Sequence, residues 1–367
     1  MYHYSQGKAT RQAHKGIPEG HFEEEQGTKG FFGPVSHLIR KNPSTNWVEI
    51  DGPLKPRMYD LVELPHRAGM QRMLFNQHMG IYNMWMKPGD EKEFVARRNA
   101  DGDLLYFCHK GKGILFSDYG MLEFEAGHYV VVPKCITHAF HPLDACQFFV
   151  VENRSSHYEE PDRGPVGRNA LYDANALVKP DLEGQEKKLA ALNLDPRIIA
   201  VKHLDEMTTY KYNTNVFDVV GWKGDLYPFT LHVDHLMPLM SHKAHLPPSA
   251  HITFVARDFV VCTFVPRPLE TDKDALKVPF YHQNIDYDEV LFYHDGDFFS
   301  RDNLHPGMMS FHPAGFAHGP HPKAMKTIDN KTETNEYAVM VDSRWPLQRD
   351  PSLDSVELSE YWKSWQG

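Results

Sequence analysis

Two histidines and one glutamate in the last third of the chain are spaced as transition-metal ligands. Six residues separate His282 from Glu289, and His318 closes a further segment with regularly spaced turn formers: Gly307, Pro313 and Gly315. Because side chains alternate faces along a strand, His282 and Glu289 must come from two strands, joined by the polar bend 284–288. The turn 313–315 then brings His318 in from a third strand. Two neutral imidazoles and one carboxylate form the ligand set favoured by non-haem Fe(II), although zinc, manganese and nickel sites use similar ligands.

Short β-type runs bounded by turns must position these ligands. In the first half the runs are 74–86, 104–108, 113–117, 128–132 and 147–152. In the second half they are 229–233, 251–255, 259–265, 289–293, 307–311 and 337–341. Two β-rich halves of similar size predict a mainly all-β protein of two fused cupin domains, double-stranded β-helix jelly rolls with a few short helices.

The pattern along the chain predicts five parts. They are an N-terminal arm or irregular cap (1–55), an N-terminal cupin-like domain (56–155), a connector (156–205), a C-terminal metal-binding cupin domain (206–345) and a helical tail (346–367). The connector includes 181–192, which has the composition of a helix. Strand Val290–Tyr293 is expected to end in a turn at Gly296.

The first half carries an incomplete copy of the second ligand segment. Gly127 and Pro133 recur at the same intervals before His138, but Cys135 replaces the glycine of the turn. No histidine and glutamate pair precedes this segment at the required spacing. We therefore expect the N-terminal domain to be metal-free and His138 to be a structural residue.

Composition narrows the class of protein. A formal net charge of −10 with scattered basic residues offers no stripe that could neutralise nucleic-acid phosphates. The longest apolar run, Phe259–Val265, is too short to span a bilayer, and the N-terminus has no signal-type apolar segment. We expect a cytoplasmic protein without membrane or nucleic-acid partners.

The cysteines lack paired spacing, which favours buried free thiols: Cys108, Cys135, Cys146 and Cys262.

Three stretches carry a resemblance to a known family. They are PDRGPVGRNAL (161–171), FDVVGWKGDLYPF (217–229) and the segment from FYHQN to AHGPHP that bears the metal ligands. Over most of its length the chain resembles the homogentisate 1,2-dioxygenase family. The resemblance implies two fused jelly rolls with Fe(II) in the second, held by His282, Glu289 and His318. It also implies that a small aromatic carboxylic acid and dioxygen are the substrates.

The resemblance implies roles for further residues. His312 and His245, the latter in the segment His245–Ser249, match histidines that act near the substrate as acid and base. The alternative for both is support of the ligands or of a loop. The positions implied to contact the substrate are Tyr281, Gln283, Phe298 and His321.

The chain also departs from the family pattern. Gln283 stands where the family often has arginine, and Phe298 where it has tyrosine. The family usually has one residue fewer between the first histidine and the glutamate. These changes concern the substrate more than the reaction, and a related hydroquinone with another side chain is an alternative.

Three other functions are alternatives. A gentisate-like or other hydroquinone dioxygenase would differ only in substrate. A zinc or manganese cupin isomerase or hydrolase would be active without oxygen, and a non-catalytic bicupin would have a broken ligand triad, whereas this triad is intact. An irregular arm and open barrel faces predict a homo-oligomer.

Overall fold

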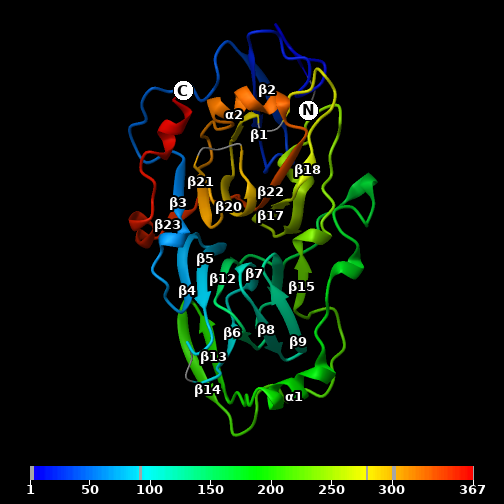
Figure 1. The fold of residues 1–367 in the computed structure, drawn as a ribbon, viewed down its shortest axis with the longest axis vertical. Coiled ribbons are helices and arrows are strands. Elements are labelled where there is room, and N and C mark those ends of the chain that lie inside the picture. The colour runs from blue at the N-terminus through cyan, green and yellow to red at the C-terminus, as the bar shows by residue number, and fades with distance from the viewer. Residues whose placement is uncertain (1–3, 91–92, 278–279, 300–302, 367) are drawn as a thin grey trace. The chain divides into compact units, whose positions relative to one another are not determined.

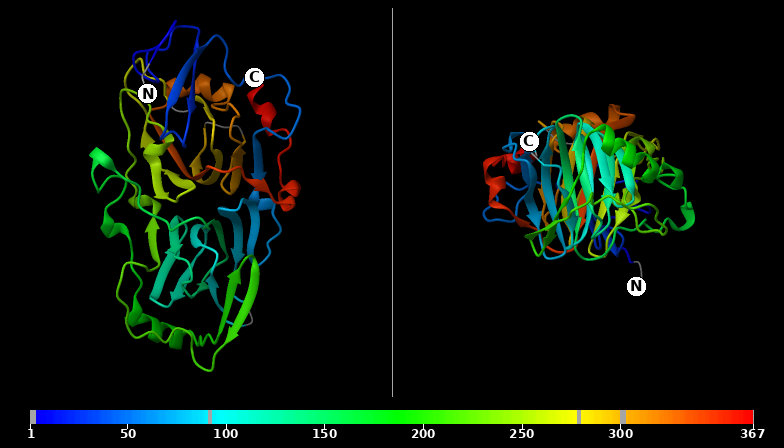
Figure 2. Two further views of the ribbon diagram at one scale, coloured as in Figure 1. Left: turned by 180° about the vertical axis from the view of Figure 1, so that it is seen from behind. Right: turned by 90° about the horizontal axis from the view of Figure 1, so that it is seen from below.

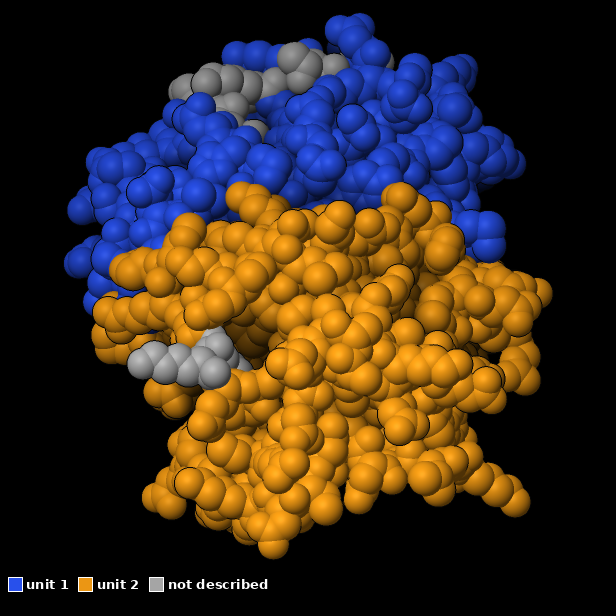
Figure 3. All heavy atoms as spheres, turned by 60° about the horizontal axis from the view of Figure 1, so that its bottom comes forward, with its two compact units in different colours: residues 1–64, 237–347, 352–367 blue, residues 65–236, 348–351 orange. Residues whose placement is uncertain are grey.

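The computed structural model describes residues 4–90, 93–277, 280–299 and 303–366 (Figure 1). The chain forms two compact units, which Figure 3 colours separately. Unit 1 comprises 1–64, 237–347 and 352–367, and unit 2 comprises 65–236 and 348–351. Each unit is built from two β-sheets, so the expected all-β architecture of two cupin domains is confirmed.

Unit 1 contains the arm together with the second half of the chain. Its larger sheet has the order β16 (Ile252–Val255), β17 (Phe259–Phe264), β22 (Glu333–Ser343), β20 (Asp288–Asp297), β21 (Met308–His312) and β3 (Arg57–Asp60), with β18 (Arg267–Pro268) also on β22. Its smaller sheet has the order β19 (Tyr281–Asn284), β1 (Phe22–Gly27) and β2 (Val35–Arg40). The helix α2 (Pro322–Thr327) follows the ligand segment.

Unit 2 contains the first barrel. One sheet has the order β15 (Phe229–His232), β10 (His128–Val132), β7 (Asp103–Lys110), β12 (Cys146–Asn153), β5 (Met79–Met86), β4 (Gly69–Phe75) and β23 (Gln348–Arg349). The other has the order β14 (Glu206–Lys211), β13 (Ile198–His203), β6 (Ala96–Asn99), β11 (His138–Pro142), β8 (Lys112–Ser117) and β9 (Gly120–Glu125).

Hydrophobic burial holds the unit 2 barrel together. A core of aromatic and aliphatic side chains from facing strands lies inside it, including Leu115, Phe124, Val130 and Phe148. The helix α1 (Leu182–Ala191) is the helix expected at 181–192. The carboxylate of Asp181 caps it by accepting from the Gly184 N–H, and the helix buries Leu189 in a second apolar cluster.

The boundaries of the units differ from the expected parts of the chain. The whole of the expected connector belongs to unit 2, where β13 pairs in parallel with β6. Residues 206–236, expected in the C-terminal domain, also lie in unit 2, since β15 pairs with β10. The arm, drawn in dark blue in Figures 1 and 2, adds its strands β1 and β2 to a sheet of unit 1, where β1 pairs with β19. Periodicity locates strands, but it does not say which strands pair.

The tail and the end of β20 differ from what the sequence predicted. The tail forms two 3-10 helices, Pro351–Ser355 and Tyr361–Trp365, in place of one longer helix. Gly296 does not end its strand: β20 continues to Asp297 past an irregularity in its pairing, and Gly296 has a φ of 101°.

All the cysteines are free, and Cys135 is the exposed one. Among the described residues, no helix is both long enough and apolar enough to cross a membrane.

Candidate metal centre

Two strands and one turn bring His282, Glu289 and His318 together in unit 1. His282 lies on β19, and Glu289 is the second residue of β20, beyond the expected bend. After the turn 313–315, His318 forms an isolated β-bridge with His282 and lies in no longer strand. One ligand atom from each of the three residues lies within 4.8 Å of the others. The pairing of β19, the start of β20 and the turn therefore places three donors at one point.

The turn before His318 is held by residues at the end of β19 and the start of β20. The carboxylate of Asp288 accepts hydrogen bonds from the backbone N–H groups of Ala314 (2.8 Å) and Leu347 (2.7 Å). The Gly315 N–H donates to the Asn284 carbonyl at 2.9 Å. Because Asp288 and Asn284 flank the bend before Glu289, the same residues fix both ligand segments.

The imidazoles present free nitrogens to the carboxylate. The Nδ1 of His282 lies 3.0 Å from the Phe280 carbonyl, and the Nδ1 of His318 lies 3.0 Å from the Phe316 carbonyl. These contacts favour the tautomer in which each Nε2 carries a lone pair. His282 Nε2 lies 3.7 Å from Glu289 Oε2, and His318 Nε2 lies 3.4 Å from Glu289 Oε1. Both Nε2 atoms are buried without a hydrogen-bond partner in the described part of the chain. The donor set and these unpaired nitrogens fit a bound transition-metal ion.

Electrostatics keep the donors in the states that bind metal. Burial and the neighbouring histidines lower the pKa of His318 to about 3, so its ring is neutral near pH 7. Burial acts to raise the pKa of Glu289, but His318, His282 and His312 hold it well below its usual value. Asp342, opposite Glu289 on β22, has its pKa raised by burial and by that carboxylate. The group thus carries one negative charge on Glu289.

His312 supports Glu289 from the adjacent strand. It pairs with Glu289 across β20 and β21, and its Nδ1–H donates to Glu289 Oε1 at 2.8 Å. Its Nε2 faces the Tyr361 hydroxyl at 3.4 Å. Both ring nitrogens therefore have neighbours within the protein, an arrangement suited to orienting a ligand.

His245 lies in a separate buried position nearby. Its Nδ1 is 3.0 Å from Glu270 Oε1, and its ring lies 4.8 Å from the Phe280 ring, which is 4.9 Å from the ring of His282. Burial lowers the pKa of His245 to about 4 despite the pairing with Glu270. The ring is therefore neutral, and Nε2 is the nitrogen left to accept a proton.

The four positions implied to contact substrate have different surroundings. Tyr281, next to His282 on β19, lines a cavity of about 260 Å³ between Phe280 and the arm. The Gln283 side-chain carbonyl accepts from the Gln26 amide at 3.2 Å.

The other two lie in packed surroundings. Phe298 is buried in an apolar cluster and stacks edge-on against Tyr293 at 5.0 Å. His321 is buried against the tail, with its Nε2 3.2 Å from Ser364 Oγ and its ring 4.5 Å from Trp365. The described contacts of Phe298 and His321 are thus with the core and the tail.

Sequence reasoning did not foresee the contribution of the arm. Glu25 pairs in register with His282, because β1 runs parallel to β19, and the Phe31 ring lies 5.7 Å from the His282 ring. The available signal was the run of glutamates in FEEEQG, whose members are buried on β1. Three buried carboxylates in one strand are unusual unless cations or imidazoles face them.

Comparison with known proteins gives the family. The model of the homogentisate 1,2-dioxygenase N-terminal region matches 23–233, and that of the C-terminal region matches 229–367. A Saccharolobus solfataricus protein named "Putative dioxygenase SSO1533" is 30% identical over 100% of this chain and 99% of its own length. Homogentisate 1,2-dioxygenases of Oryza sativa subsp. japonica and Mus musculus are 26% and 23% identical over 73% of this chain.

The chain matches only part of the length of the plant and mouse enzymes. They span only 60% of the rice enzyme and 63% of the mouse enzyme. Among solved structures, a cupin 2 conserved barrel domain protein from Leptotrichia buccalis aligns with 78% of this chain and 96% of its own, at 8% identity and a TM-score of 0.37. The two family models together cover nearly the whole chain, and they confirm the resemblance carried by its motifs. The chain belongs to the homogentisate 1,2-dioxygenase family of oxygen-incorporating oxidoreductases.

Proposed function

We propose that this chain is an Fe(II)-dependent, extradiol-type ring-cleaving dioxygenase of homogentisate or a related para-hydroquinone carboxylic acid, in tyrosine and phenylalanine catabolism. Its iron ligands are His282, Glu289 and His318. The observation that carries the proposal is the pair of buried, unpartnered Nε2 atoms facing the Glu289 carboxylate, within a chain of this family. Two neutral donors and one anionic donor on one side leave positions for substrate and dioxygen.

Each residue has a defined task in the proposal. Ferrous iron held there supplies the redox centre at which an electron-rich ring and dioxygen combine. His245 Nε2 accepts the proton of the ring hydroxyl, since its Nδ1 is engaged by Glu270 and its pKa, lowered by burial to about 4, keeps it neutral. His312 is a positioning residue that holds Glu289 through the hydrogen bond to Oε1.

The substrate pocket is proposed around β19. Tyr281 and Gln283 flank His282 on this strand, and Gln283 offers an uncharged amide where the family often has arginine. An amide binds a carboxylate less strongly than a guanidinium does, which favours a para-hydroquinone whose side chain differs from that of homogentisate. Phe298 and His321 stay proposed substrate contacts, and their described contacts are with Tyr293 and with Ser364 of the tail.

Anaerobic reconstitution with Fe(II), followed by oxygen uptake with a substrate panel, tests the proposal. The panel contains homogentisate, gentisate and para-hydroquinone acids with longer side chains. We expect the protein to consume one oxygen molecule for each ring that it cleaves. This activity should require Fe(II) and should be absent from His318→Ala. Oxygen uptake fastest with gentisate would support the gentisate-like alternative. Turnover without oxygen in the Zn²⁺ or Mn²⁺ form would identify the cupin isomerase alternative and overturn the proposal.

The assembly and the location of the protein stay predictions. We propose a homo-oligomer in the cytoplasm. Size-exclusion chromatography with light scattering measures the assembly, and cell fractionation measures the location. A monomeric mass would contradict the first, and recovery of the protein with membranes would contradict the second.

A further inference from the structure

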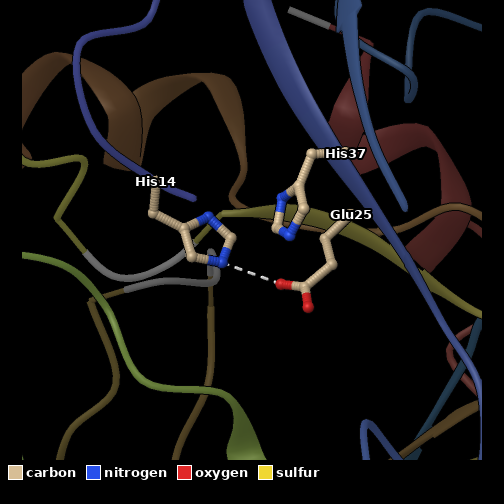
Figure 4. A group of neighbouring side chains, drawn as sticks. All are labelled: His14, Glu25 and His37. Carbon is tan, nitrogen blue, oxygen red and sulfur yellow. Dashed lines mark hydrogen bonds and ion pairs between the residues drawn. The ribbon is translucent and has the colours of Figure 1, made fainter. Parts of the chain in front are cut away.

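A second group of imidazole and carboxylate side chains lies in the arm, and Figure 4 shows it. His14 precedes β1, Glu25 lies on β1, and His37 lies on β2. One ligand atom from each lies within 4.8 Å of the others. His14 Nε2 is 2.8 Å from Glu25 Oε2, and the His37 ring faces the same carboxylate. Three segments of the arm therefore converge on one point.

A second carboxylate lies on the other side of both rings. Glu23 Oε2 is 3.0 Å from His14 Nδ1, and Glu23 Oε1 is 3.4 Å from His37 Nδ1. In metal sites a carboxylate often lies beside the non-coordinating nitrogen of a histidine ligand, where it selects the tautomer and orients the ring. Glu23 is placed to do this for His14 and His37 together, which leaves the remaining nitrogens directed toward Glu25.

The hydrogen bonding of the group is incomplete. His14, Glu23 and Glu25 are at most 4% exposed, and the His37 side chain is 23% exposed. Among the described residues, His14 Nδ1, His37 Nδ1 and Glu23 Oε1 have no hydrogen-bond partner of good geometry despite their short distances. Buried polar atoms without partners are costly, and in native proteins they often mark an ion or water that completes the site. The half-buried His37 gives that ion a route from solvent.

The buried carboxylates also need a positive charge. Lys15 and Arg40, basic neighbours in the arm, form ion pairs with Asp272 and Glu24 instead. Isolated carboxylates in a buried site are strongly destabilising unless a cation or proton balances them. A divalent cation would balance Glu23 and Glu25 while both imidazoles stay neutral.

We propose that the arm binds a divalent transition-metal ion through His14, Glu25 and His37, at a site separate from the candidate catalytic centre. Imidazole with carboxylate suits zinc, iron or nickel. The ion cross-links the segment before β1 to both arm strands. Because Glu25 pairs in register with His282, this site fastens the arm beside the strand that carries the first catalytic ligand. We assign the ion a structural role, because it cross-links three segments of the arm; the ring of His14 also lies against His245, the proposed proton acceptor, and against Phe280.

The rival state is a metal-free ion pair. Burial acts to lower the pKa of His14, but Glu23 and Glu25 raise it to about 9, so a protonated His14 between the carboxylates is the alternative source of positive charge. The two states differ in the number of metal ions bound, which makes them separable without any measurement of activity.

Counting metal ions in the full-length protein tests the proposal. The metal-free protein is dialysed against buffered Zn²⁺, and bound zinc is measured by mass spectrometry for wild type, His37→Ala, His318→Ala and the double variant. We expect each single variant to bind one ion fewer than wild type and the double variant to bind two fewer. Taking differences removes zinc bound elsewhere. His21→Ala, an arm histidine whose ring contacts the Glu19 carbonyl, is the matched control and should keep the wild-type count.

A second measurement covers the case in which a variant folds poorly. In the His318→Ala background, Zn²⁺ should raise the melting temperature by roughly 5 °C, and the rise should vanish when Glu25→Gln, which keeps the size of the side chain, is added. The proposal is overturned if His37→Ala binds as much zinc as wild type, or if the rise survives Glu25→Gln. If His37→Ala binds one zinc ion fewer than wild type but still takes up iron at the catalytic site, the proposal of an arm site is supported. This result does not depend on which substrate the enzyme uses.

Discussion

The two barrels place a histidine in the same local geometry, yet among the described residues only His318, and not His138, belongs to a group of potential metal ligands. In unit 1 the Nδ1 of His318 lies 3.0 Å from the carbonyl two residues earlier, and in unit 2 the Nδ1 of His138 lies 3.1 Å from the Ile136 carbonyl. His318 Nε2 faces a carboxylate, whereas His138 Nε2 lies 3.1 Å from the Tyr106 hydroxyl. The turn motif therefore sets the ring, and the neighbouring strands decide its partner.

Strand register identifies what replaces the other ligands. His318 pairs with His282, and His138 pairs with Arg97. The residue six before His318 pairs with Glu289, and the residue six before His138 pairs with Leu104. A cation and an aliphatic side chain thus occupy the positions of the first histidine and the glutamate. The register explains why this ligand set is not assembled around His138, and the metal-free state of the first barrel stays a prediction.

In the described part of the chain, the first barrel contains a cavity next to His138 in place of a cluster of ligands around it. A cavity of about 540 Å³ lies there, lined by Arg97, Leu104, Tyr106 and His138 among others. The candidate ligand set lies instead in unit 1, because binding a metal requires donors at one point rather than volume.

Removing the histidine from each barrel should give the largest contrast. His318→Ala should lose the bound iron, and turnover should fall by on the order of 10³-fold or more, since a ligand of the reactive ion is gone. His138→Ala should keep iron and turnover but lose about 2 kcal/mol of unfolding free energy through the cavity and the lost hydrogen bonds. Iron content, oxygen uptake and urea unfolding measure these effects. Equal iron loss in both variants would break the comparison.

Acid should destabilise unit 2 through His138. Burial lowers its pKa to about 4 in the folded chain from 6.5 when unfolded, so between these values the unfolded state binds more protons. The contribution to stability is full above pH 6.5 and is lost as the pH falls toward 4, by roughly 3 kcal/mol in total. Urea unfolding at several pH values should show a shallower decline for His138→Gln than for wild type. Parallel curves would show that His138 does not titrate in this way.

The ligand-supporting histidine of unit 1 should show an intermediate effect. His312→Ala removes the hydrogen bond to Glu289 and should weaken iron binding about 10- to 100-fold. His312→Asn, whose amide N–H can take the place of Nδ1–H, should recover part of that affinity. Iron titration monitored by ring-cleavage activity and by direct metal analysis measures both. Failure of the asparagine variant to recover any affinity would argue against a positioning role.

The smallest effect should come from the partner of His138. Tyr106→Phe removes the hydroxyl next to His138 Nε2 and should cost about 1 kcal/mol of unfolding free energy. Iron content and turnover should stay at the wild-type level, because unit 1 holds the candidate centre. A large drop in turnover would show that the first barrel takes part in the reaction.

Much of the fold and of the centre could be predicted from local pattern. The alternation of β-type runs indicated two jelly rolls, and the composition of 181–192 indicated the helix α1. The spacing of His282, Glu289 and His318 indicated two strands joined by a bend, then a turn that leads to a third strand. The structure contains the two strands and the turn, whereas His318 forms only an isolated bridge with His282. These signals are local, since a turn and an alternating strand fix directions over a few residues.

Other features could not be read from local pattern. Phe298 packs against Tyr293 in an apolar cluster that joins distant parts of the chain, and its expected contact with the substrate stays a prediction. The structure also adds the arm strand to β19, which places Glu25 beside His282, although more than 250 residues separate them in the chain.

The sequence by itself determined which side chains could bind a metal and which way each points along its own strand. Only the tertiary structure decided that His14, Glu25 and His37 meet in the arm, and that Arg97 and Leu104 fill the ligand positions of the first barrel. The physical reason is that strand pairing joins residues distant in the chain, and its register depends on burial summed over whole sheets.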